Sequence, residues 1–113
     1  MKSRTKVALT GLALSLGTGV MLAAPAAENW ENNCASCHGA DGKGQTKQGK
    51  KLKVSDYTDA KMQAQLKDED MLKAVLEGVK DKASGKERMK GFKEETSEAE
   101  AKDLVAYIRK FKA

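Results

Sequence analysis

The stretch "NNCASCHGADGKG", Asn32–Gly44, contains both cysteines and the only histidine of a 113-residue chain. Cys34, Cys37 and His38 form the pattern Cys-x-x-Cys-His, which brings two thiols and an imidazole together. Three kinds of chemistry use such a cluster: a dithiol redox pair, a metal site, or the covalent attachment of a haem. The rest of the sequence has to distinguish among them.

The first 26 residues have the order of a secretory signal peptide. Three basic residues come first: Lys2, Arg4 and Lys6. An uncharged apolar segment, Val7–Leu22, and the small-residue run "AAPAA" follow. The segment is shorter than the about 20 apolar residues of a membrane-spanning helix, and glycines interrupt it. We therefore predict cleavage after Ala26, which leaves Ala27–Ala113 as one domain that is exported to the periplasm and does not insert into a membrane.

Charge and cysteine spacing exclude further classes of protein. The formal net charge is +5, and three of the basic residues belong to the signal segment, so no nucleic-acid binding is expected. Cysteines of exported proteins often form stabilising disulfides. A loop that encloses only two residues constrains the unfolded chain little, however. The spacing therefore favours redox, metal or haem chemistry.

The hydrophobic pattern after the signal segment is helical. A first helix is predicted to run to about Cys37, because three residues at i, i+4 and i+7 share one face: Trp30, Cys34 and Cys37. The Gly- and Lys-rich segment Gly39–Val54 is predicted to be a surface loop. Tyr57–Leu66 is predicted to be a short helix, with Thr58 as its N-cap.

Two more helices are expected toward the C-terminus, so the fold class is predicted to be all-α. One begins near Asp68 and has a buried stripe of Leu72, Val75, Leu76 and Val79. Lys80–Thr96 is predicted to be irregular, and no segment alternates with a period of two. Ser97 and Glu100 form a capping box at the start of the last helix. One face of that helix is apolar: Ala101, Leu104, Tyr107, Ile108 and Phe111.

The helical pattern favours haem over the other two interpretations of the cysteines. A thioredoxin-like pair belongs to an α/β domain, and no strands are predicted. Zinc needs three or four protein ligands, and the chain has no second Cys or His pair. One helical turn instead allows two thiols to reach two vinyl groups of one porphyrin. We predict that Cys34 and Cys37 bind haem c covalently and that His38 is the proximal iron ligand.

A methionine is the expected ligand on the other side of the iron, because the chain has one histidine. Met62, Met71 and Met89 remain after removal of the signal. Met62 and Met71 fall in predicted helices, where methionine usually fills the core. Met89 lies in an irregular, glycine-flanked segment that can fold over the distal face, so we favour it. Two filled axial positions are typical of an electron carrier.

Together these segments resemble the small, single-haem class I cytochromes c over the whole mature chain. "CASCHGADGKG" is similar to the haem-binding turn of that family, "GKERMKGF" to its methionine loop, and "SEAEAKDLVAYIRKF" to its C-terminal helix. The resemblance implies that the N- and C-terminal helices cross, with Trp30 against Tyr107, and that Met89 is the distal ligand. It also implies an electron carrier that works between redox partners and is not an enzyme.

The chain departs from the family pattern at two places. Pro25 is the only proline, so none follows His38 or Met89. We therefore expect a backbone carbonyl of the 39–54 loop to orient the imidazole of His38. A labile Met89 would give the alternative function, a haem sensor or weak peroxidase with an open coordination site.

The placement of charge suggests where a partner docks. Five lysines and no acid lie between positions 43 and 53: Lys43, Lys47, Lys50, Lys51 and Lys53. Lys86, Arg88, Lys90 and Lys93 surround Met89, whereas acidic residues open the last helix. If the haem lies between these segments, its exposed edge is ringed by positive charge and suits an acidic redox partner. The alternative, that the lysines only solubilise loops, remains open.

Overall fold

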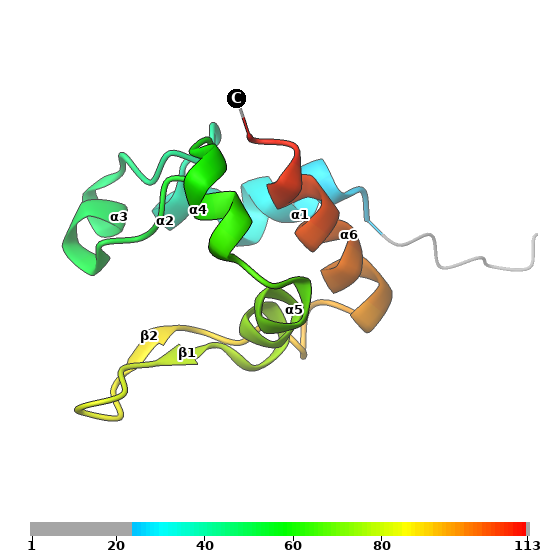
Figure 1. Cartoon of the computed structure of the whole chain (residues 1–113). Coiled ribbons are helices and arrows are strands. Elements are labelled where there is room, and N and C mark those ends of the chain that lie inside the picture. Colours follow the sequence, from blue (N-terminus) through cyan, green and yellow to red (C-terminus); the bar gives the residue numbers. More distant parts are fainter. Residues whose placement is uncertain (1–23, 113) are drawn as a thin grey trace, which may run out of the picture.

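The first and last helices of the described chain cross, as predicted (Figure 1). The computed structural model describes residues 24–112, so nearly all of the predicted signal segment lies outside the described residues. Helices α1 (Ala26–Asn33) and α6 (Glu98–Arg109) contact each other. The Trp30 ring lies against Tyr107, with ring centroids 5.8 Å apart, and against Phe111 at 5.0 Å. The expected aromatic contact between Trp30 and Tyr107 is therefore confirmed.

The predicted first helix is interrupted in the middle of the cysteine motif. Helix α1 ends at Asn33, and a second short helix, α2, spans Ala35–His38. Cys34 lies between them with φ −119° and ψ −36°. Asn and Cys both have low helix propensity, which favours a break at this position. The prediction of one continuous helix to Cys37 was wrong in this respect.

The predicted loop from 39 to 54 contains a helix, α3 (Lys47–Leu52). The Thr46 side chain caps it by accepting a hydrogen bond from the Gly49 N–H, at 2.8 Å. Lys53 ends it in the left-handed conformation, with φ 55°. A Cβ atom on Gly49 would collide with the carbonyl oxygens of Cys37 and Gly44, so glycine allows α3 to pack closely on α2.

The next two helices agree with the predicted helices, except at the N-cap of the first and at the last buried residue of the second. Helix α4 (Ala60–Gln65) is capped by Asp59 rather than by Thr58, whose hydroxyl and N–H instead donate to Asp56. Helix α5 spans Asp68–Glu77 and buries Met71 and Val75. Leu72 and Leu76 are partly buried against the same core. Val79, predicted to complete the buried stripe, lies beyond the helix and is 38% exposed.

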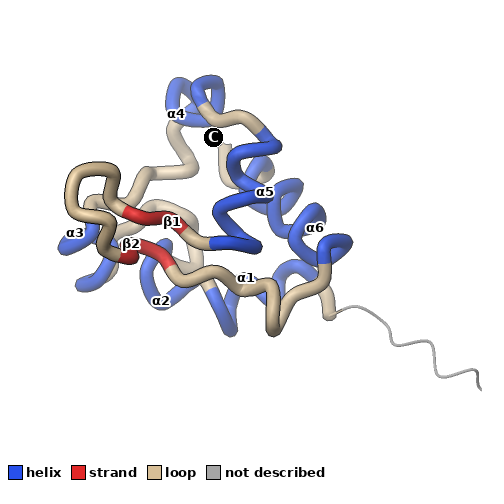
Figure 2. Tube along the Cα trace, turned by 90° about the horizontal axis from the view of Figure 1, so that it is seen from below, coloured by secondary structure: helices blue, strands red, loops and turns tan. Residues whose placement is uncertain are grey.

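A small β-hairpin replaces part of the predicted irregular segment. Strands β1 (Val79–Lys80) and β2 (Glu87–Met89) pair antiparallel, with Val79 opposite Met89. Figure 2 shows the hairpin, in red, at the end of α5. Strands this short carry no readable period-two pattern, so sequence periodicity could not reveal them.

The core of the domain lies among α1, α5 and α6. Its buried apolar members are Trp30, Cys34, Met71, Val75, Ala101, Leu104, Val105 and Ile108. Arg109 at the end of α6 donates to the carbonyl of Leu66 at 2.7 Å and pairs with Asp68, also at 2.7 Å. No helix among residues 24–112 is long and apolar enough to cross a membrane.

The predicted capping box of α6 is present and gives a test of the fold. The Ser97 side chain accepts a hydrogen bond from the Glu100 N–H at 3.1 Å, and Glu100 returns one to the Ser97 N–H. We expect Ser97→Ala to lower the free energy of unfolding by about 1 kcal/mol. Guanidinium denaturation of the holoprotein measures this loss. Ser84→Ala, in the exposed hairpin turn, is the control, and equal losses in both variants would contradict a special role for the cap.

Candidate functional site

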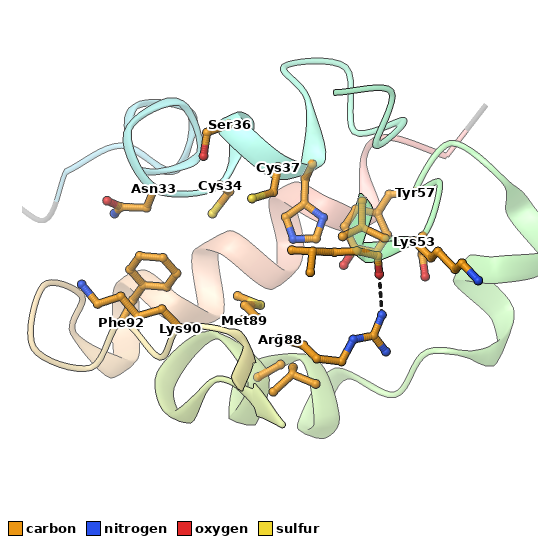
Figure 3. Close-up of a pocket in the computed structure, with 16 residues that line it drawn as sticks. Asn33, Cys34, Ser36, Cys37, Lys53, Tyr57, Arg88, Met89, Lys90 and Phe92 are labelled. Carbon is orange, nitrogen blue, oxygen red and sulfur yellow. Dashed lines mark hydrogen bonds between the residues drawn. The ribbon is translucent and has the colours of Figure 1, made fainter. Parts of the chain in front are cut away.

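A cavity of about 380 Å³ lies between the cysteine motif and the hairpin segment. Its volume is within the range of small-molecule and cofactor sites. Cys34, Cys37 and His38 line it, and Figure 3 shows Met89 and Phe92 on the side opposite Cys34 and Cys37. The two thiols, the imidazole and the thioether predicted from the sequence are therefore brought to one cavity.

Among the described methionines, only Met89 lines this cavity. Met71 is 6% exposed and belongs to the core, as its place in a helical stripe suggested. Met62 is half-buried on α4 and is not part of the cavity wall. Position in the fold therefore favours Met89 as the thioether that a bound group would meet.

The Cys34 thiol does not have the depressed pKa of a redox-active cysteine. Both cysteines are free, with Cys34 buried and Cys37 partly buried. Burial, with a smaller contribution from Cys37, raises the pKa of the Cys34 thiol to about 11. Redox-active cysteines instead have depressed pKa values. In the part of the chain that the structure covers, no three His, Cys, Asp or Glu side chains are grouped to hold a metal ion. Both findings weaken the two alternatives to haem attachment.

His38 is enclosed by aromatic rings. Its ring centroid lies 5.3 Å from that of Tyr57, in a stacked arrangement, and 5.7 Å from that of Trp30. Burial lowers the pKa of His38, which favours the neutral imidazole, the form that binds iron. Nδ1 is buried and has no hydrogen-bond partner among the described residues. The carbonyl that we expected in the 39–54 loop therefore does not reach it.

Hydrogen bonds hold the backbone at the end of the cysteine motif. The carbonyl oxygens of three consecutive residues all accept at least one: Cys37, His38 and Gly39. The Thr46 hydroxyl donates to the first at 2.6 Å, and the Gly44 N–H donates to the second at 2.8 Å. Trp30 Nε1 donates to the third at 3.0 Å. These bonds position His38 through its main chain, and no sequence motif indicated the part played by Thr46.

Met89 is positioned by a close approach of two chain segments. Gly78 ends α5 with φ 82°, and the chain returns past it at Gly91. A Cβ atom on Gly91 would lie 2.6 Å from the backbone carbon of Glu77 and 2.7 Å from the carbonyl oxygen of Leu76. Only glycine fits here without a shift of the backbone.

Hydrogen bonds fix the segment after Met89 to the end of α5. The N–H of Phe92 donates to the carbonyl of Val75 at 2.8 Å, and the N–H of Lys93 donates to that of Leu76 at 3.2 Å. The carbonyls at a helix C-terminus lack hydrogen-bond partners within the helix. These bonds give the last carbonyls of α5 a donor and the N–H groups after Met89 an acceptor. They supply the restraint that a proline after Met89 would otherwise give.

Three basic residues line the cavity: Lys53, Arg88 and Lys90. Arg88 of β2 donates a hydrogen bond to the Leu52 carbonyl of α3, which connects the two sides of the cavity (Figure 3). Lys53 and Lys90 also line it, and Lys90 pairs with Glu95 at 2.7 Å. The five lysines between 43 and 53 are all exposed. Of the basic residues predicted to form a positive rim, three therefore line the cavity: Lys53, Arg88 and Lys90.

Comparison with known proteins agrees with this geometry. The family model described as cytochrome c matches residues 23–112. A solved structure titled KustC0563 c-type cytochrome is 33% identical, with a TM-score of 0.68, over 78% of this chain and 98% of that one. A structure of a tyrosine-to-phenylalanine mutant of Kustc0563 is 33% identical, with a TM-score of 0.66, over 78% and 99%. No curated protein sequence matches the chain.

Proposed function

Because the chain belongs to the cytochrome c family, we propose that it is an exported single-haem electron carrier with His38 and Met89 as axial iron ligands. Membership confirms the class I fold and the covalently bound haem c expected from the sequence. It also supports the coarser function, a haem-containing electron carrier. The observation that carries the finer proposal is the cavity, whose facing walls present His38 and Met89.

Cys34 and Cys37 are proposed to form the covalent links. Each thiol would add across one vinyl group, with sulfur bonding to one carbon and the proton going to its neighbour, so the addition needs no oxidant. The free state of both thiols and their shared cavity wall support this role. The alternative assignment, a disulfide between them, would leave the cavity without attachment points.

The remaining roles follow from the chemistry of the ligands. When bound, haem c supplies an iron that exchanges single electrons. Met89 supplies a thioether, which favours the reduced metal and raises the reduction potential. His38 supplies a neutral imidazole, and apolar wall residues such as Val54 and Phe92 exclude water. If both residues bound the iron, no coordination position would be open to a substrate, which would favour a carrier over a sensor or peroxidase.

An optical spectrum of the exported holoprotein, oxidised and then reduced, tests the proposal. We expect sharp low-spin bands that do not change when carbon monoxide is added to the reduced form. High-spin bands or ready carbon monoxide binding would instead favour the sensor or weak peroxidase. Absence of haem would overturn the whole proposal.

The covalent links can be tested one at a time with Cys37→Ala. We expect a holoprotein with one thioether, whose reduced pyridine complex absorbs at longer wavelength because one vinyl group stays conjugated with the ring. Ser36→Ala, the neighbouring position in α2, is the matched control and should keep the wild-type band. An unchanged band in Cys37→Ala would remove Cys37 from the attachment.

An acidic redox partner is proposed to dock over the positive rim of the cavity. Exposed lysines on α3 and basic residues of the hairpin segment support it, because complementary charge speeds encounter. We expect Lys51→Glu combined with Lys53→Glu to slow bimolecular electron transfer with an acidic partner by about tenfold at low salt. Lys102→Glu, on α6, is the control. A rate independent of both salt and the α3 substitutions would contradict this docking site.

Export to the periplasm is proposed from the sequence of the first 26 residues. Cell fractionation and the intact mass of the secreted form test it together. We expect the periplasmic protein to begin at Ala27 and to carry the mass of one haem. A protein retained in the membrane with Met1 still present would overturn the cleavage.

A further inference from the structure

The imidazole of His38 lacks the support that a metal-binding histidine usually has. Such a histidine almost always donates its second ring N–H to a carbonyl, a carboxylate or water. Here Nδ1 is buried and no described residue accepts a hydrogen bond from it. The bonds to the carbonyls of residues 37–39 position the main chain but leave the ring free to rotate about its side-chain bonds. Something else has to fix the plane of the ring.

The nearest group that can do so is the ring of Tyr57. It stacks on the His38 ring with an interplanar angle of 26° and a centroid distance of 5.3 Å. The Trp30 ring is tilted by 39° to the His38 ring, at 5.7 Å, and forms a second wall. Tyr57 also lines the haem cavity (Figure 3). The imidazole therefore has a stacked ring and a tilted ring beside it, which limit its rotation.

Tyr57 is itself held firmly by its main chain. Its N–H donates to the Gly42 carbonyl at 2.9 Å, and its carbonyl accepts from Gln63 Nε2 at 2.8 Å. Gln63 is 4% exposed and donates also to the Ile108 carbonyl of α6, at 2.8 Å. The main chain of Tyr57 is thus tied to α4 and, through Gln63, to α6, while its ring lies edge-on to the Trp30 ring, with centroids 6.3 Å apart.

We propose that Tyr57 is a positioning residue, which fixes the His38 imidazole by stacking and keeps water away from Nδ1. This inference rests on the proposed role of His38 as an iron ligand. A hydrogen bond from the second ring nitrogen raises the basicity of the ligand. An imidazole held without one is a weaker donor, so the reduced iron is favoured and the reduction potential is raised. Aromatic stacking then orients the imidazole, as the carbonyl of a proline after His38 would have done. A hydrogen bond to that carbonyl would lower the reduction potential, whereas stacking without such a bond raises it.

The test compares holoproteins that keep or lose the ring. Tyr57→Leu removes the stack, whereas Tyr57→Phe keeps the ring and removes only the hydroxyl. Tyr107→Leu is the matched control, because Tyr107 contacts Trp30 and Phe111 in the same aromatic group. Three properties are measured: the midpoint potential, the g values of the oxidised protein, and the exchange of the His38 Nδ1 proton in deuterated water by paramagnetic NMR.

We expect Tyr57→Leu to admit water beside Nδ1. The proton should exchange faster, the g values should change, and the ratio of oxidised to reduced protein at a fixed potential should rise about tenfold, equivalent to a fall of about 59 mV. Tyr57→Phe and Tyr107→Leu should match the wild type in all three. If the leucine variant does not retain haem, Tyr57→Ile takes its place.

Three outcomes would overturn the inference. The leucine variant could keep the wild-type potential and exchange rate, the phenylalanine variant could change as much as the leucine variant, or Tyr107→Leu could produce the same shifts. The first two exclude the ring, and the third shows a general effect of the aromatic group. Failure of the proposed function is seen separately, because a wild-type protein without low-spin bands would show that His38 and Met89 are not the ligands.

Discussion

The Met89→Ala holoprotein is expected to lose the sulfur-to-iron charge-transfer band near the red end of the oxidised spectrum. Removal of the thioether leaves the cavity without a sulfur donor from methionine, because no other described methionine lines it. The reduced variant should then bind carbon monoxide, which the wild type should not. The ratio of oxidised to reduced protein at a fixed potential should rise at least tenfold, a fall of about 59 mV or more, because a thioether favours the reduced metal.

Met62→Ala is the matched control for this experiment. Met62 is half-buried on α4 and away from the cavity wall, so its loss should leave the band, the carbon monoxide response and the potential unchanged. A Met89→Ala protein that stays low-spin and keeps the band would identify another ligand. The same result in Met62→Ala and Met89→Ala would show that the band reports general destabilisation.

The sequence predicted the elements that depend on local signals. The capping box of α6 needs only Ser97 and Glu100 at the right spacing, and it is present. The crossing of α1 and α6 and the contact of Trp30 with Tyr107 were both implied by the family resemblance, and both are present. The start of α5 at Asp68 also agrees with the prediction. In these places local propensity and tertiary packing favour the same structure.

The predictions that were wrong concern segments whose secondary structure depends on tertiary contacts. Helix α3 has no apolar stripe of its own, and its stability depends on the Thr46 cap and on the close fit of Gly49 against α2. The hairpin strands β1 and β2 are too short to show a period, and backbone contacts with the end of α5 hold the segment that follows. The Thr46 cap is local, but the contact of Gly49 with α2 and the bonds of the hairpin segment to α5 join segments that are further apart along the chain.

In the candidate site, too, residues that belong to a local motif were predicted, and contacts made only by the folded chain were not. Cys34, Cys37 and His38 follow from one local motif, and they line the cavity together. The choice of Met89 came from eliminating helical methionines and from the family resemblance, and its place on the opposite wall agrees with that choice. The stacking of Tyr57 on His38 could not be predicted, since the two residues are joined only through the folded loop.

Gly91→Ala is expected to displace Met89 without removing it. The added methyl group would lie 2.6 Å from a backbone carbon of Glu77, and neither segment has a flexible side chain that can give way. The chain must therefore move away from α5, which strains the hydrogen bonds of Phe92 and Lys93 and carries Met89 with it. We expect a partial loss of the charge-transfer band, together with a loss of unfolding free energy of about 1–3 kcal/mol, the usual cost of overpacking.

Gly85→Ala separates this effect from a general effect of glycine replacement in the hairpin. Gly85 has φ 69° but no atom within 4 Å of an added Cβ, so alanine there costs only the left-handed conformation, about 1–2 kcal/mol. The two variants should therefore lose similar stability, while only Gly91→Ala loses the band. Because Met89 and its surroundings are chemically intact in both proteins, this difference would show that the approach of Gly91 to α5 controls whether the thioether stays bound. An intact band in Gly91→Ala would mean that the bond to iron holds the loop, and not the reverse.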